Sequence, residues 1–238
     1  MRDPRGRRAP FPAAFLFFLL SPLFLICPVS GWFDETHLAV AKAAGYGKWY
    51  NAAGADIAKV KADTTERFNH YVSGSGDVTP EEVLRQIDRY NDPRDAKGHL
   101  YGAIIASVLA YQGAADAGKY PEYHLAYCAH YIGDLSQPEH HIPGREENER
   151  RHKANEQAAE KDVLKNLVLI ERSMYSILLR PEHLKDDLAR EIARIANISR
   201  SLALAQQKEG RTLSPGEIFQ QLGHSASLLR AVLKALGR

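Results

Sequence analysis

Apolar residues recur along most of this chain at intervals of three and four positions, which is the spacing of one face of an α-helix. Val, Ile, Phe and Thr do not gather in the alternating runs that are typical of half-buried strands. The pattern predicts an all-α fold, a single-domain multi-helix bundle without a linker long enough to divide it. Helices are expected at roughly 34–46, 50–62, 80–91, 97–117, 121–137, 147–180, 183–207 and 215–236.

Local signals mark some of the helix ends. Thr79 and Ser214 are each followed by a proline and, three residues on, by a glutamate, which is the order of an N-cap, a first-turn proline and an early carboxylate. Pro181 is expected to end the long helix over 147–180. The helix over 215–236 carries the apolar stripe of a packed bundle helix, so we interpret it as core and not as a membrane-surface helix.

The N-terminal segment differs from the rest of the chain. Four arginines lie within the first ten residues, and Phe11 to Val29 is almost wholly apolar. This arrangement predicts a secretory signal peptide over 1–31, cleaved between Gly31 and Trp32, and a mature helical domain over 32–238. The protein would then be exported to the periplasm or the extracellular space. Without cleavage the same segment would act as a membrane anchor, because it is nearly long enough to span a bilayer.

Removal of 1–31 changes the charge. That segment holds four arginines and one aspartate, so 27 of the 31 basic and 28 of the 29 acidic side chains remain. A mature chain with so small a net charge is not expected to hold long duplex nucleic acid by phosphate neutralisation, although a small nucleolytic site stays compatible with it. Cys128 is the one cysteine after position 31, which excludes an intrachain disulfide. We interpret Cys128 as a buried helix residue.

Candidate metal ligands are densest in the stretch HYIGDLSQPEHH, from His130 to His141. His130 and Asp134 are four residues apart and would project from one face of a helix. Pro138 would end that helix and turn His140 toward a neighbouring point. Imidazole nitrogens and carboxylate oxygens are ligands that zinc accepts. Taken alone, the stretch also fits a helix end with surface histidines.

Further candidates lie on both sides of this stretch. His37, Asp56 and His70 precede it, each near a predicted helix. His152 and Glu156 follow it, again four residues apart, within a charged segment that would otherwise form a solvated helix face. Each of these residues is a weak signal by itself.

Taken together, these residues resemble, in identity and order, the nine-ligand trinuclear zinc site shared by bacterial zinc-dependent phospholipases C and single-strand-specific zinc nucleases. The nine positions are Trp32, His37, Asp56, His70, His130, Asp134, His140, His152 and Glu156. The resemblance runs from Trp32 to Glu156 and implies the all-α fold of that superfamily with three bound zinc ions. It also fits the predicted cleavage, because in that family the amine and carbonyl of the mature N-terminal Trp are metal ligands.

The resemblance implies a division of the ligands among three ions. One zinc would be held by Asp56, His70, His130 and Asp134. A second would be held by Trp32 and His37, with Asp134 as the bridge. The third would be held by His140, His152 and Glu156.

The chemistry implied is phosphodiester hydrolysis. Two adjacent zinc ions would lower the pKa of a shared water and present hydroxide to phosphorus, and the remaining ion would neutralise charge on the phosphoryl and leaving oxygens. The products would be a phosphomonoester and an alcohol. Asp56 could also orient or deprotonate the nucleophilic water, so it is the candidate catalytic residue.

Two substrate classes stay open. Glu156 as the last ligand, the 14-residue step from Asp56 to His70 and the lack of disulfide cysteines are similar to the phospholipase branch, which makes a phospholipid the first expectation. The short step from Trp32 to His37 is similar to the nuclease branch, so a single-strand-specific endonuclease is the alternative.

Residues near the ligands in the sequence indicate which phospholipid head group the site could accept. Glu35 matches an acidic residue that contacts choline in the phosphatidylcholine enzymes. Ile57 and Arg67, however, stand where those enzymes place aromatic residues, so a quaternary ammonium would lose its aromatic faces. Tyr71 could line a head-group pocket or stack on a base. Phosphatidylcholine specificity is therefore not expected.

A third hypothesis belongs to another class: a secreted, zinc-stabilised binding protein without turnover. A closed coordination sphere would favour it, because a catalytic zinc site keeps a position open for water and substrate. The partners expected are a phospholipid head group or a single-stranded nucleic acid, with transient contact to a membrane surface. No stable protein partner is implied.

Overall fold

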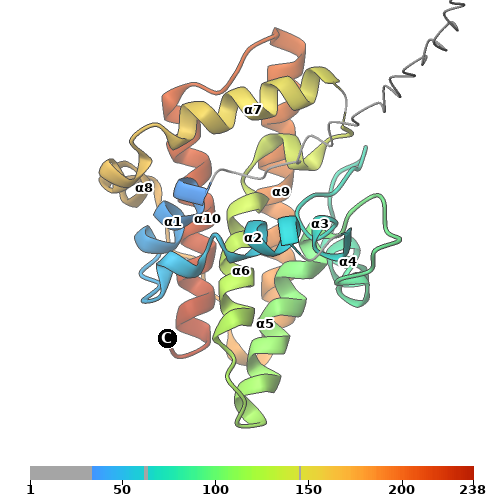
Figure 1. Ribbon diagram of the computed structural model, residues 1–238, viewed down its shortest axis with the longest axis vertical. Coiled ribbons are helices and arrows are strands. Elements are labelled where there is room, and N and C mark those ends of the chain that lie inside the picture. Colours follow the sequence, from blue (N-terminus) through green and yellow to red (C-terminus); the bar gives the residue numbers. More distant parts are fainter. Residues whose placement is uncertain (1–33, 62–63, 145) are drawn as a thin grey trace, which may run out of the picture.

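The computed structural model describes residues 34–61, 64–144 and 146–238, and in this part of the chain every regular element is a helix (Figure 1). The predicted all-α class is therefore confirmed. The α-helices are α1 (Asp34–Ala43), α2 (Gly54–Lys61), α3 (Thr64–Arg67), α4 (Pro80–Arg85), α5 (Leu100–Asp116), α6 (Glu122–Leu135), α7 (Glu146–Glu160), α8 (Leu167–Ser173), α9 (Leu184–Glu209) and α10 (Pro215–Ala235). Short 3-10 turns are η1 (Trp49–Asn51), η2 (Ile87–Arg89), η3 (Pro138–His141), η4 (Val163–Lys165) and η5 (Pro181–His183). The predicted signal segment 1–31 and Trp32 lie outside the described residues.

Helix α6 is the centre of the bundle. It packs against α1, α2, α5, α9 and α10, and α7 crosses the end of the bundle at which α6 finishes (Figure 1). Because neighbours surround it, α6 buries side chains on every side, Leu125 and Ile132 among them. His130 and Asp134 are buried with them at 0% exposure. A buried imidazole and a buried carboxylate require partners, and these two residues lead to the functional site.

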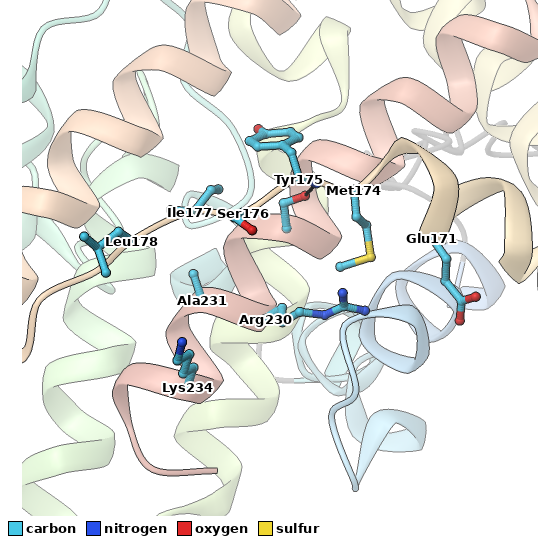
Figure 2. Close-up of a pocket in the computed structure, with 10 residues that line it drawn as sticks. Glu171, Met174, Tyr175, Ser176, Ile177, Leu178, Arg230, Ala231 and Lys234 are labelled. Carbon is cyan, nitrogen blue, oxygen red and sulfur yellow. Dashed lines mark hydrogen bonds between the residues drawn. The ribbon is translucent and has the colours of Figure 1, made fainter.

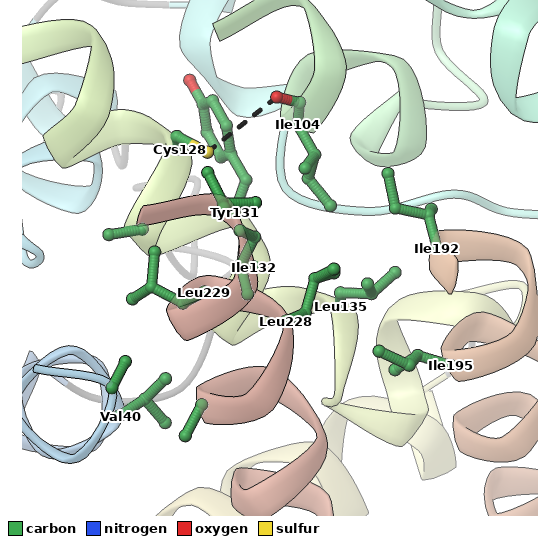
Figure 3. Close-up of a cluster of buried hydrophobic side chains, with 14 of the residues drawn as sticks. Val40, Ile104, Cys128, Tyr131, Ile132, Leu135, Ile192, Ile195, Leu228 and Leu229 are labelled. Carbon is green, nitrogen blue, oxygen red and sulfur yellow. Dashed lines mark hydrogen bonds between the residues drawn. The ribbon is translucent and has the colours of Figure 1, made fainter. Parts of the chain in front are cut away.

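The hydrophobic core is formed where four long helices and α1 meet. Figure 3 shows side chains from these helices packed around Ile132 and Leu135 of α6: Val40, Ile104, Ile192, Ile195, Leu228 and Leu229. Cys128 belongs to this core, with its thiol 4.0 Å from the carbonyl oxygen of Ile104. Burial raises the pKa of Cys128 to about 12, so it is a packed thiol and not a nucleophile, as predicted.

Helix α10 is a core helix. It buries the apolar stripe that the sequence predicted, with Leu222 and Val232 at 0% exposure. In the described part of the chain no helix combines the length and the apolar character needed to cross a bilayer.

The predicted helix starts at Thr79 and Ser214 are confirmed. The Thr79 hydroxyl accepts a hydrogen bond from the Glu82 amide at 3.2 Å. Ser214 forms a reciprocal capping box with Glu217, in which each side chain bonds the other residue's backbone amide. The predicted helix over 121–137 ends at Leu135, and the turn at Pro138 is the 3-10 turn η3.

The predicted helix over 147–180 is wrong in its second half. The chain forms α7, the turn η4 and the short helix α8, and residues 174–180 are not helical. Asp162 takes the left-handed conformation, with φ of 63°, which ends the first segment. Asn166 donates to the Asp162 carbonyl at 2.9 Å, and Lys165 pairs with the Asp162 carboxylate. Polar side chains therefore terminate this helix without a glycine or a proline.

A close approach to α10 accompanies the end of α8. A Cβ built on Gly223 would lie 2.6 Å from the Cβ and from the carbonyl oxygen of Ser173, so only glycine permits this contact. The backbone amide of Tyr175 then donates to the Ser227 hydroxyl at 2.9 Å. Packing on α10, and not Pro181, therefore decides where the helical segment stops.

Candidate metal centre

Eight of the nine predicted ligands meet at one end of the bundle, and the ninth, Trp32, lies outside the described residues. They come from separate elements: His37 from α1, Asp56 from α2, His70 from the turn after α3, His130 and Asp134 from α6, His140 from η3, and His152 and Glu156 from α7. The two helical pairs arise because residues four apart share one face. The remaining residues are brought in by the packing of α1, α2 and α7 around the end of α6.

The first group has five ligand-to-ligand distances of the size found in a tetrahedral metal site. The Nδ1 atom of His70 lies 2.9 Å from Asp134 Oδ2 and 3.2 Å from His130 Nε2. His130 Nε2 lies 3.3 Å from Asp134 Oδ2, and Asp56 Oδ1 lies 3.8 Å from His70 and 3.7 Å from His130. A tetrahedron with metal–ligand bonds of about 2.0–2.1 Å has edges of about 3.3 Å. These four side chains could therefore hold one metal ion with little rearrangement.

The second carboxylate oxygen of Asp134 faces a different group. Asp134 Oδ1 lies 3.5 Å from His37 Nε2 and 3.6 Å from His140 Nδ1. All three atoms are buried and make no hydrogen bond with the described residues. Such a set is costly unless a cation satisfies it, so Asp134 is placed to bridge two ions.

The third group is assembled from η3 and α7. His140 Nε2 lies 3.2 Å from His152 Nε2, which in turn lies 2.7 Å from Glu156 Oε1. His140 thus presents one ring nitrogen to Asp134 and the other to His152, and it lies between the second and third groups. The residue sets predicted for the three sites are each brought together, apart from Trp32.

The protonation states of these groups suit metal binding. Burial lowers the pKa of His37 to about 3 and lowers the pKa of His140 well below its ordinary value, so both rings are neutral and can offer a lone pair. Burial by itself would raise the pKa of Asp134, but the neighbouring His130, with hydrogen bonds from His130 and His70, holds this pKa well below its ordinary value. Asp134 is therefore ionised, as a bridging ligand must be.

Hydrogen bonds behind the ligands fix their orientation. His130 Nδ1 donates to the carbonyl oxygen of Ala52 at 2.8 Å, which leaves Nε2 for a metal. His70 Nε2 faces Glu66 Oε1 at 3.6 Å, and Glu66 is held by Asn69 at 3.2 Å and by the hydroxyl of Tyr131. These supporting residues were not found from the sequence. The four-residue spacing of Glu66 and His70 was the one local signal for them.

A second supporting network underlies the third group. Asn155 donates to both oxygens of Glu139, at 3.0 and 3.1 Å, and Arg151 Nε lies 3.3 Å from the same carboxylate. The carbonyl oxygen of the Asn155 side chain accepts the backbone amide of Leu213 at 2.8 Å. The network ties α7 to η3 and to the segment before α10, and it therefore positions His152 relative to His140.

Gly133 makes room for His37. A Cβ built on Gly133 would lie 2.4 Å from His37 Nδ1, well inside contact distance. The His37 ring also stacks on the His130 ring, with centroids 3.7 Å apart. A glycine at this position of α6 is therefore a condition for bringing α1 and its histidine to the metal centre.

The centre reaches a hollow at the surface. A cavity of about 220 Å³ is lined by His140 and His152 together with Arg67 and Tyr71. Arg67 is exposed and places a cation there, while Tyr71 is held through its hydroxyl by the Ala96 carbonyl at 3.3 Å. The predicted substrate residue Tyr71 is thus beside the ligands. Glu35, the other predicted substrate residue, is exposed in the first turn of α1 and is not among the residues that line this hollow.

Three further histidines and a larger hollow do not belong to the ligand groups. His99 is buried between Asn69 and Asp95, His183 is exposed, and His141 bonds Tyr101 and the Leu135 carbonyl, each at 2.8 Å. A cavity of about 440 Å³ lies between the segment after α8 and α10. Residues that line it, such as Met174, Leu178 and Arg230, are shown in Figure 2. None of the eight predicted metal ligands that the structure describes lines it. We therefore place the candidate site at the end of α6 alone.

Comparison of this chain with protein-family models, with curated proteins and with solved structures found no match. The functional argument therefore rests on the residues and their geometry.

Proposed function

We propose that this protein is a zinc-dependent phosphodiester hydrolase of the phospholipase C and single-strand nuclease type, with a phospholipid as its substrate. The observation that carries the proposal is the group formed by Asp56, His70, His130 and Asp134. Five of its interatomic distances, 2.9 to 3.8 Å, are close to the edges of a tetrahedral ligand set, and Asp134 turns its other oxygen to a second set. Nitrogen and carboxylate ligands without thiolates favour zinc over softer or purely oxygen-bound ions.

The chain would hold three zinc ions. Asp56, His70 and His130 hold the first together with Asp134. His37, Asp134 and the amine and carbonyl of Trp32 hold the second, and His140, His152 and Glu156 hold the third. When bound, these ions would lower the pKa of a coordinated water and neutralise charge on the phosphoryl oxygens.

Asp56 and Arg67 have separate roles in the proposed reaction. Asp134 is fully buried, whereas the Asp56 side chain keeps 15% exposure, so Asp56 is the carboxylate of the first group that an entering water can reach. Asp56 accepts the proton of that water or orients it. Arg67, at the mouth of the hollow, attracts the anionic phosphodiester and is drawn toward its non-bridging oxygens.

The hollow favours catalysis over a purely structural role for the metal. His140 and His152 line a cavity open to solvent, so the third group is accessible to a substrate. A structural zinc site is instead closed by protein ligands on all sides. This access supports an enzyme over the zinc-stabilised binding protein.

A nuclease is the second candidate. Tyr71 and Arg67 line the same hollow, and an aromatic ring beside a cation is the combination with which proteins hold single-stranded nucleic acid. The substrate must therefore be decided by assay.

Export and cleavage before Trp32 belong to the proposal, because the second ion needs a free terminal amine. The mature protein is therefore the form to test. Metal content and hydrolysis are measured together, with phosphatidylcholine vesicles, single-stranded DNA and the soluble diester bis(p-nitrophenyl) phosphate as substrates. We expect about three zinc ions per chain and turnover of the lipid and of the soluble diester.

The matched variants are Asp134→Asn and, on the exposed face of η2, Asp88→Asn. Loss of the bridging carboxylate should remove the first two ions and abolish turnover, while Asp88→Asn should change neither. Turnover of DNA alone would replace the phospholipase with the nuclease. A mature chain that binds no zinc would end the proposal.

A further inference from the structure

A third hollow, beside the first turns of α6, is lined by tyrosines. It has a volume of about 360 Å³ and lies between η1, the start of α2 and the first turns of α6. Tyr50, Tyr120 and Tyr123 are 60%, 65% and 52% exposed, and Ile57 beside them is 50% exposed. Large apolar side chains this exposed are ordinary when scattered, but a group around one hollow marks an interaction surface. We refer to these four residues and Tyr127 as the tyrosine face.

The tyrosine face is built on two of the helices that carry the first ligand group, α2 and α6. Ile57 directly follows the ligand Asp56 on α2. Tyr123 and Tyr127 precede the ligand His130 on α6 by seven and three residues, so the three side chains follow one side of the helix. Seven residues of helix span about 10 Å. A flat surface in contact with Tyr123 would therefore lie about 10 Å along α6 from the ligand His130.

Two cations pair with the one carboxylate of this hollow. Glu122 is the one charged residue among the described residues that line the hollow, and it is buried. Its carboxylate is paired with Lys48 at 3.4 Å and with Arg238. Lys48 also lies beside Tyr120, with its ammonium 5.3 Å from the centre of that ring. Two cations to one carboxylate leave a positive side-chain charge at the rim, which complements the phosphates of a lipid surface.

We propose that the tyrosine face is the surface with which this protein docks on a phospholipid bilayer. Tyrosine rings are apolar with a polar tip, and they are enriched at the boundary between lipid and water for that reason. Single-stranded nucleic acid is the less suitable occupant, because it requires cations along the groove that follows its backbone, and here they stand only at the rim. The inference rests on the proposed function, because docking would deliver the phospholipid substrate to the enzyme. Docking itself can be measured as vesicle binding, without turnover.

The test compares two triple variants of the mature protein. Tyr50→Ser/Tyr120→Ser/Tyr123→Ser removes the exposed rings and leaves the part-buried Tyr127 in place. The control, Val168→Ser/Leu178→Ser/Leu204→Ser, removes exposed apolar side chains of 49%, 76% and 40% exposure from α8, the following segment and α9. Vesicle binding is measured by flotation with phosphatidylcholine vesicles, with and without phosphatidylglycerol. Binding of single-stranded DNA is measured by gel shift, and activity is measured on bis(p-nitrophenyl) phosphate.

We expect the tyrosine variant to bind vesicles at least tenfold more weakly than the wild type and the control, with unchanged kcat/KM on the soluble diester. Phosphatidylglycerol should strengthen binding by the wild type. Equal loss in both triple variants, or no binding by the wild type, would overturn the inference. Weaker binding of single-stranded DNA with unchanged vesicle binding would assign the face to nucleobases instead. Vesicle binding without hydrolysis of any diester would leave the docking surface standing and refute the proposed function.

Discussion

Gly133→Ala is the sharpest single-atom test of the metal centre. The added Cβ would lie 2.4 Å from His37 Nδ1, whereas an ordinary contact between these atoms is 3.4 Å or more. Either His37 or α1 must move by about 1 Å, because Gly133 is fixed inside the central helix. A metal site tolerates errors of only about 0.2 Å in its ligand distances. We therefore expect the variant to lose the ion that His37 holds.

Overpacking of this kind also costs about 1–3 kcal/mol of stability. The matched control is Gly113→Ala on the exposed part of α5, where an added Cβ has nothing within 4 Å. That variant should gain about 0.5–1 kcal/mol from helix propensity. Metal content and thermal unfolding are measured for both. If Gly133→Ala retains about three zinc ions and full turnover, His37 is not a ligand in the proposed geometry and the second group must be abandoned.

Two further predictions concern the fold. Gly223→Ala should cost about 1–3 kcal/mol, because its Cβ would meet the Ser173 backbone at 2.6 Å, while Gly216→Ala, with nothing within 4 Å, should be neutral or slightly stabilising in a denaturant titration. Glu217→Gln should cost about 1 kcal/mol at neutral pH by weakening the capping box and the pairs with Arg211. Hydrogen bonds from Arg211 lower the pKa of Glu217 to about 2, so its contribution is present above the unfolded pKa near 4.5 and is lost as the pH falls toward 2. The stability difference between the wild type and Glu217→Gln should therefore shrink steadily as the pH falls from about 4.5 toward 2, and a constant difference down to pH 2 would refute this assignment.

The parts of the fold that the sequence predicted are those that local signals govern. The caps at Thr79 and Ser214 and the central apolar helix need only neighbouring residues to form. The break after α7 depends on Asp162 in a left-handed conformation and on the approach of Ser173 to Gly223, 50 positions away in the sequence. No pattern within the helix indicates such a contact.

The site divides in the same way. The pairs His130 with Asp134 and His152 with Glu156 follow from helical spacing, and the resemblance supplied the remaining ligands. The ring nitrogen that each histidine presents could not be predicted, because it is decided by distant partners such as the Ala52 carbonyl behind His130. The Glu66–Tyr131 contact behind His70 joins residues 65 positions apart.

Helix α7 is attached to the bundle in an unusual way. Its buried residues, each of which the structure describes, are Asn148, Arg151, His152, Asn155, Glu156 and Ala159, and only the last is apolar. Burial of one methyl group gives little hydrophobic stabilisation, of the order of 1 kcal/mol. The helix is therefore held by the Glu139–Asn155–Arg151 network and by the side chains of the third ligand group.

It follows that metal removal should release α7 before the rest of the fold. Burial raises the pKa of Glu156 to about 7, so without a cation this carboxylate is partly protonated at neutral pH and its attraction to His152 weakens. We expect a chelator to increase backbone amide exchange across Glu146–Glu160 while α6 and α9, which bury apolar side chains into the core, stay protected. The measurement is hydrogen exchange with mass spectrometry on the mature protein, before and after chelation and again after zinc is restored. A uniform rise over all helices would show that metal supports the whole bundle, and no change in α7 would show that the polar network alone holds it.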